Sequence, residues 1–128
     1  MFECKSDIMP RVTHFDILAD DPERAAAFWN RAFGWEFSKW EGPMDYWMIM
    51  TGKGEGIDGG LSKRDPSQPL VPFSIDVPDI DGYIARVVSE GGRLLAPKYA
   101  IPGVGWYAPF QDTEGNVFGM MEEDRDAR

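Results

Sequence analysis

The chain has 128 residues, of which 43% are hydrophobic and 13% aromatic, and it carries a formal net charge of −9 at pH 7. A domain of this size buries enough apolar surface to fold without a structural metal, and its single cysteine, Cys4, excludes an internal disulfide. The acidic charge disfavours nucleic acid as a partner, because a phosphate backbone would be repelled. No apolar stretch of about 18 residues is present, so we expect no membrane span and a cytoplasmic protein.

The first half of the chain predicts a strand, a helix and three further strands. Polar and apolar residues alternate over 12–18, as in a strand with one face on a core. Asp21, Pro22 and Glu23 supply an N-cap, a first-turn proline and a first-turn acid, and Gly34 is placed to end a helix over 22–33. The three short strands expected after this helix are Trp35–Phe37, Tyr46–Met50 and Gly56–Leu61.

The second half repeats this pattern after a proline-rich segment. Residues 64–71 indicate a linker, because repeated prolines withhold backbone donors and stiffen the chain. Alternation then returns over 73–77, and Asp79 and the pair Gly91-Gly92 mark the two ends of a second helix. The remaining predicted strands are Arg93–Leu95, Trp106–Phe110 and Asn116–Met121.

The two halves align at a constant spacing. The helix caps Asp21 and Asp79 are 58 residues apart, and so are Gly34 and Gly92. A duplicated unit explains this spacing. We therefore predict an α+β fold in which two tandem βαβββ modules form a cupped mixed sheet with the helices on the outside. The domain would span residues 1–128, with modules at about 10–63 and 72–123.

Two sequence runs carry a family resemblance. They are His14-Phe-Asp-Ile-Leu-Ala-Asp-Asp-Pro-Glu-Arg-Ala25, followed after Ala26 and Ala27 by Phe28-Trp-Asn-Arg-Ala-Phe-Gly-Trp35, and Asp112-Thr-Glu-Gly-Asn-Val-Phe-Gly119. The first resembles the opening, and the second the closing motif, of the vicinal oxygen chelate superfamily, which includes glyoxalase I, bleomycin-resistance proteins and extradiol dioxygenases. The resemblance covers about residues 10–123. It implies two modules that curl around a ligand cleft, usually within a homodimer.

The resemblance also implies where metal ligands would stand in metal-dependent members. The four positions fall on His14, Gly60, Pro72 and Gly119, and only His14 has a donor side chain. A catalytic zinc keeps about three protein ligands, so we expect no metal and no other cofactor. A rearranged site stays open as an alternative, in which His14, Asp16 and one further carboxylate hold Fe²⁺ or Mn²⁺.

The candidate site centres on the only histidine. Asp16 shares a strand face with His14, and the two are the candidate catalytic residues, because an imidazole titrates near working pH. The other interpretation of His14 is a hydrogen-bonded wall residue. Aromatic and methionine side chains on the strands predict an apolar cleft. The candidate ligand-binding residues are His14, Asp16, Trp47, Asp58, Gly60, Ser74, Trp106, Gly119 and Met121.

The expected function follows from a family pattern that lacks most of its metal ligands. We expect a metal-independent small-molecule-binding protein that holds a small apolar or aromatic ligand, within a homodimer. One alternative is a lyase, isomerase or dioxygenase that uses a rearranged metal site or an acid/base pair around His14. Another is a ligand-free interaction module. Whether the protein is an enzyme stays open at this point.

Overall fold

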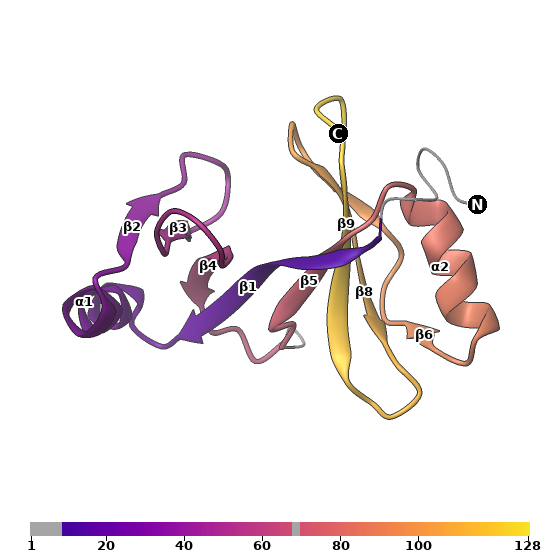
Figure 1. Ribbon diagram of the computed structural model, residues 1–128, viewed down its shortest axis with the longest axis horizontal. Coiled ribbons are helices and arrows are strands. Elements are labelled where there is room, and N and C mark those ends of the chain that lie inside the picture. The colour runs from indigo at the N-terminus through magenta and orange to yellow at the C-terminus, as the bar shows by residue number, and fades with distance from the viewer. Residues whose placement is uncertain (1–8, 68–69) are drawn as a thin grey trace. The chain divides into compact units, whose positions relative to one another are not determined.

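The computed structural model describes residues 9–67 and 70–128 (Figure 1). Cys4 and residues 68–69 of the predicted linker lie outside the described residues. The described residues divide into two compact units, one within His14–Leu70 and one made of Val71–Arg128 with residues 9–13. One boundary between them, at Leu70 and Val71, falls inside the segment predicted as a linker, and the other lies between Thr13 and His14.

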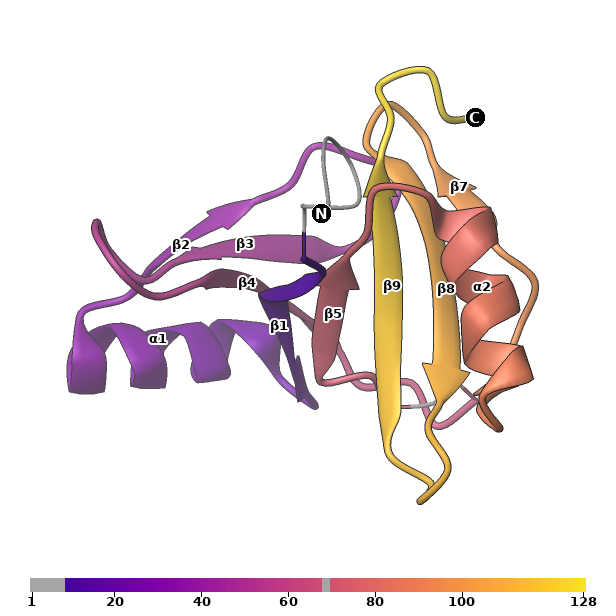
Figure 2. The same ribbon diagram turned by 45° about the vertical axis from the view of Figure 1, so that its right-hand side comes forward.

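The first module has the predicted order of elements. It consists of β1 (Arg11–Ala19), α1 (Pro22–Phe33), β2 (Glu36–Lys39), β3 (Tyr46–Met50) and β4 (Asp58–Lys63). Its strands lie in the order β2-β3-β4-β1, in which β1 and β4 are parallel and the other two pairs are antiparallel. Helix α1 lies along one face of these strands, as Figure 2 shows.

Helix α1 begins and ends where its local sequence predicts. The Asp21 side chain accepts a hydrogen bond from the Arg24 backbone N–H, and Pro22 occupies the first turn. At the other end Gly34 has a φ of 80°, in the left-handed region, and its N–H donates to the Asn30 carbonyl. Between the helix and the sheet lies a core centred on three buried side chains, those of Ala19, Ile49 and Leu61.

The second module repeats this plan with one strand more. It consists of β5 (Phe73–Asp76), α2 (Ile80–Ser89), β6 (Arg93–Leu94), β7 (Tyr99–Ile101), β8 (Gly105–Gln111) and β9 (Val117–Glu123). Its strands lie in the order β5-β9-β8-β6, and the short β7, which was not predicted, also pairs with β8. The α+β class and the repeated strand–helix–strands pattern are thus confirmed. Within the described residues, neither helix has the length and hydrophobicity that crossing a membrane requires.

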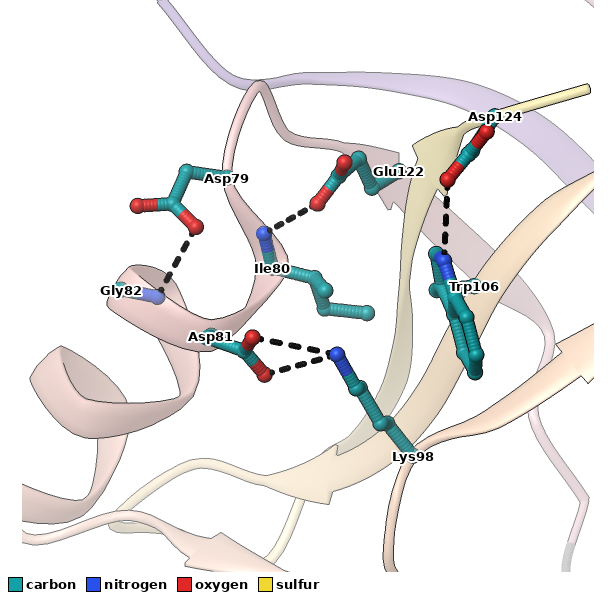
Figure 3. Close-up of polar contacts among 8 residues, drawn as sticks. All are labelled: Asp79, Ile80, Asp81, Gly82, Lys98, Trp106, Glu122 and Asp124. Atoms are coloured by element: carbon teal, nitrogen blue, oxygen red, sulfur yellow. Dashed lines mark hydrogen bonds and ion pairs between the residues drawn. The ribbon is translucent and has the colours of Figure 1, made fainter. Parts of the chain in front are cut away.

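Polar contacts fix the start of α2 against β8 and β9 (Figure 3). The Glu122 carboxylate on β9 accepts a hydrogen bond of 2.9 Å from the Ile80 N–H, one of the donors that the first turn of a helix leaves unpaired. The Lys98 ammonium forms an ion pair of 3.0 Å with Asp81 and lies 4.6 Å from the centre of the Trp106 ring. Trp106 therefore belongs to the helix side of its strand.

Candidate functional site

The first module presents two chemically different faces. Side chains alternate along a strand, and Phe15, Ile17, Trp47 and Leu61 all belong to the core under α1. The intervening residues therefore lie on the opposite face. We call this the His14 face, and it carries His14, Asp16, Leu18, Tyr46, Met48 and Gly60.

A compact polar cluster lies on the His14 face. The His14 Nε2 atom is 2.8 Å from the Tyr46 hydroxyl oxygen, and the Tyr46 hydroxyl donates to Asp16 Oδ1 over 3.4 Å. The distance from His14 Nε2 to Asp16 Oδ1 is 3.5 Å. The side chains of His14 and Asp16 keep 35% and 24% of their surface exposed, so the cluster is accessible to a ligand. The structure thus brings together the two predicted catalytic residues and adds a tyrosine.

Tyr46 occupies the space that a side chain at position 60 would need. On β4, Gly60 pairs with Met48, so Tyr46 sits one diagonal step away on the same face. A Cβ atom added to Gly60 would overlap the Tyr46 hydroxyl and the ring carbon that bears it. Gly60 is buried and its backbone is not left-handed, so the phenol ring, rather than an unusual dihedral angle, makes glycine necessary there.

The second module repeats this tyrosine–glycine pair. On β9, Gly119 pairs with Pro109, and a Cβ atom added to Gly119 would overlap the hydroxyl of Tyr107, again one diagonal step away. Ser74 pairs with Gly119 and is buried, whereas Asp76 on the same face pairs with Met121. Burial, followed by repulsion from a nearby glutamate, raises the pKa of the Asp76 carboxyl above its ordinary value. Ser74, Gly119 and Met121, all predicted site residues, therefore share one face with Tyr107.

Two predicted ligand-binding residues lie on the helix side instead. Trp47 packs against the buried core under α1, and Trp106 packs against the core under α2. Trp47 therefore does not share a face with Gly60, nor Trp106 with Gly119. Side chains alternate along a strand, so the neighbouring tyrosine, Tyr46 or Tyr107, lies on the glycine face instead. The third residue, Asp58, has its hydrogen-bond partners nearby in the chain. Its carboxylate accepts hydrogen bonds from both the backbone N–H and the hydroxyl of Thr51.

The donor set does not fit the metal that the family resemblance implies. Glycine at 60 and 119 and proline at 72 offer no side-chain donor, and phenol rings fill the space above both glycines. Over residues 9–67 and 70–128, no group of three or more histidine, cysteine, aspartate or glutamate side chains is placed to hold a metal ion. A zinc or iron site needs at least that many protein ligands as a rule. The polar groups that cluster on the His14 face are the imidazole of His14, the phenol of Tyr46 and the carboxylate of Asp16.

Two open hollows of about 450 Å³ each lie on the surface of the first module at α1. One lies between α1 and the β2–β3 pair, and the other lies on the helix alone. Neither is lined by His14, Asp16 or Tyr46, so both are separate from the polar cluster. The residues that line them are Ala26, Ala27, Asn30, Glu36, Phe37 and Met50 for the first, and Arg24, Ala27, Phe28, Arg31 and Ala32 for the second.

Solved structures with a similar fold include two from bacteria. Methylmalonyl-CoA epimerase from Mycobacterium tuberculosis has a TM-score of 0.69 at 16% identity, over 88% of this chain and 87% of that one. A hypothetical protein from Bacillus halodurans C-125 has a TM-score of 0.71 at 13% identity, over 93% of this chain and 98% of that one. Identities this low show the fold and leave the activity open.

Sequence relatives point to one family. A "Glyoxylase-like domain-containing protein" of Didymella fabae is 31% identical over 117 residues, which are 86% of this chain and 91% of that protein. The "Putative glyoxylase CFP32" of Mycobacterium tuberculosis is 30% identical over 115 residues, and the match spans 84% of this chain but only 42% of that longer protein. Residues 13–121 also match the model of the glyoxalase-like domain. The chain therefore belongs to the glyoxalase-like domain family.

Proposed function

We propose that this protein binds a small molecule on the His14 face without the help of a metal ion. The observation that carries the proposal is the Tyr46 hydroxyl, which stands over Gly60 and lies 2.8 Å from His14 Nε2. A metal-ligating side chain at position 60 would need the space that the Tyr46 hydroxyl occupies. The half-exposed His14, Tyr46 and Asp16 supply polar contacts, and Met48, 40% exposed, supplies adaptable apolar surface beside them.

The proposal predicts that purified protein contains far less than one metal ion per chain and that ligand binding survives chelation. Elemental analysis would measure Fe, Mn, Zn and Ni before and after dialysis against EDTA. A fragment screen followed by backbone amide NMR would then be run on the chelated protein. We expect the shifts to gather on β1, β3 and β4 around His14 and Gly60.

The control for this experiment is the His14→Ala variant. Stoichiometric metal in the parent protein that is lost in His14→Ala, together with fragment binding that needs added metal, would contradict the proposal. Shifts confined to the hollows at α1 would contradict the location of the site.

The same cluster favours a second candidate function, a metal-independent lyase or isomerase. Histidine, tyrosine and aspartate within about hydrogen-bonding reach of one another can hold and pass a proton. We expect this function to depend on proton transfer, so His14→Gln would abolish turnover of a candidate substrate while its dissociation constant changes little. Turnover that persists in His14→Gln would exclude His14 as the acid or base. Binding that is lost together with turnover would favour the anchoring role of the first proposal.

A further inference from the structure

We propose that the hollow between α1 and the β2–β3 pair is a second binding site, which takes a small primary amine on an apolar body. We call it the Glu36 hollow, and the hollow on the helix alone the arginine hollow. The Glu36 hollow has a volume of about 450 Å³, within the range of small-molecule pockets. The inference goes beyond the proposed function, because it assigns a different ligand class to a different place on the first module.

The polar side chains that line the Glu36 hollow offer free acceptors. They are those of Asn30 and Glu36. The Asn30 Nδ2 group donates to the Trp35 carbonyl over 2.9 Å, which sets the orientation of the amide. Over residues 9–67 and 70–128, neither Asn30 Oδ1 nor the Glu36 carboxylate has a hydrogen-bond or ion-pair partner. An ionised carboxylate only accepts hydrogen bonds, so these groups favour a ligand that brings donors.

The helical turn of α1 keeps its arginines away from the Glu36 hollow. Successive residues of an α-helix lie about 100° apart around the axis. Asn30 therefore lies on one side of Ala27, and Arg24 and Arg31 lie on the other. Ala27 lines both hollows, whereas the two arginines line only the arginine hollow. Glu36 is thus the one charged residue among those that line the Glu36 hollow.

The charge of Glu36 favours a cationic ligand. An ammonium group carries three N–H donors on a compact positive charge, so it matches both the Glu36 carboxylate and the Asn30 carbonyl. A carboxylate ligand would be repelled by Glu36, and an alcohol would bring a donor without the charge. The net charge of −9 on the whole chain adds to the attraction for cations.

The other side chains that line the Glu36 hollow are apolar. Ala26 and Ala27 present only methyl groups, which leaves room beside the helix. Phe37 on β2 packs against the core under α1, and Met50 on β3 is 37% exposed and adds an adaptable thioether. A phenyl group or a short alkyl chain would bury apolar surface against Phe37 and Met50. An arylalkylamine therefore combines the features that this hollow favours.

Four probes with one phenylethyl body separate these features. They are 2-phenylethylamine, its N,N,N-trimethylammonium analogue, 2-phenylethanol and 3-phenylpropionate. Backbone amide NMR titrations of the full chain at pH 7 should give the tightest binding for 2-phenylethylamine, with shifts at the residues that line the Glu36 hollow. The trimethylammonium analogue keeps the charge without an N–H donor, and the alcohol keeps a donor without the charge. Each should bind at least about threefold more weakly than the amine, and 3-phenylpropionate should bind most weakly.

Substitution of Glu36 tests the charge directly. Glu36→Gln should weaken 2-phenylethylamine by about threefold to fivefold, the effect of one exposed ion pair, and should leave 2-phenylethanol unchanged. Glu90→Gln is the matched control, because Glu90 is also exposed but lies at the end of α2 in the second module. It makes the same change in net charge and should alter neither affinity. Ala27→Leu keeps a strong helix former and fills the hollow, so it should weaken both probes.

Three results would overturn the inference on chemical grounds. Equal binding of the amine and its trimethylammonium analogue would reject the need for donors. Equal binding of the amine and the alcohol, or an unchanged amine affinity in Glu36→Gln, would reject the charge match. Tightest binding of 3-phenylpropionate that is lost in Arg31→Gln would place the ligand in the arginine hollow instead. Binding of none of the probes would reject the site.

The inference and the proposed function fail separately. Amine shifts that gather around His14 and vanish in His14→Ala would overturn the inference, while small-molecule binding on the His14 face would stand. A stoichiometric metal ion lost in His14→Ala would overturn the proposed function and leave the amine titration at the Glu36 hollow unchanged. We expect 2-phenylethylamine to bind His14→Ala as tightly as it binds the parent protein.

Discussion

Replacing Gly60 by alanine is expected to lower the free energy of unfolding by about 2 kcal/mol, within the range for overpacking a filled site. The added Cβ would overlap the Tyr46 hydroxyl, so the ring must move and its bond to His14 must lengthen or break. Urea denaturation followed by tryptophan fluorescence would measure the change. The same substitution should also disturb the NMR signals of the His14 ring.

The matched control for Gly60→Ala is the same change in a Tyr46→Ala background. With the ring absent, the new methyl group finds space, and the loss of backbone freedom in the unfolded chain favours alanine slightly. The second substitution should therefore be neutral or mildly stabilising there. An equal loss in both backgrounds would show that the Tyr46 ring is not what requires glycine at position 60.

Replacing Leu61 by alanine is expected to lower the free energy of unfolding by about 3 kcal/mol. Leu61 is 0% exposed and lies in the core between α1 and the sheet, so the substitution leaves a cavity that Ala19 and Ile49 border. Leu70→Ala is the control, because Leu70 is 58% exposed and its truncation should cost less than about 0.5 kcal/mol. A small effect at Leu61 would mean that this core collapses around the lost volume.

The limits of both helices could be predicted because the signals are local. An aspartate that caps the first turn and a proline or acid just after it act within a few residues, and Gly34 needs only its own left-handed dihedral angle. The same is true of the prolines that mark the segment before Val71. Short-range chemistry of this kind is visible in sequence without any knowledge of tertiary contacts.

Local sequence signals could not predict whether the tyrosine or the tryptophan of each strand faces the candidate site. In each module an aromatic pair, Tyr46-Trp47 or Trp106-Tyr107, occupies a strand, and one member must face the helix. Which one does so depends on the register with β4 or β9, and a shift of one residue exchanges the two faces. The loop before β4 contains Gly52, Gly54 and Gly56, all with positive φ. Because glycines allow many loop conformations, the sequence did not predict the register of β3 with β4.

The short strand β7 was missed for a related reason. Tyr99–Ile101 spans three residues and pairs with the first three residues of β8, where Ile101 lies opposite Gly105. Three residues are too few to show an alternating pattern, and their strand conformation depends on the partner. The predicted limits of β2 and β4 differed from the observed ones by one or two residues.

The tyrosine that stands over each glycine also constrains how this chain could change over evolutionary time. A mutation that introduced glutamate or histidine at position 60 would meet the Tyr46 ring before it could serve any ion. The reverse order, loss of the tyrosine first, would break the contact with His14 before a replacement existed. The two substitutions are thus epistatic, and the steric part of this barrier recurs at Tyr107 and Gly119. A lineage that carries these pairs could therefore place a metal-ligating side chain at position 60 or 119 only by changing the tyrosine as well.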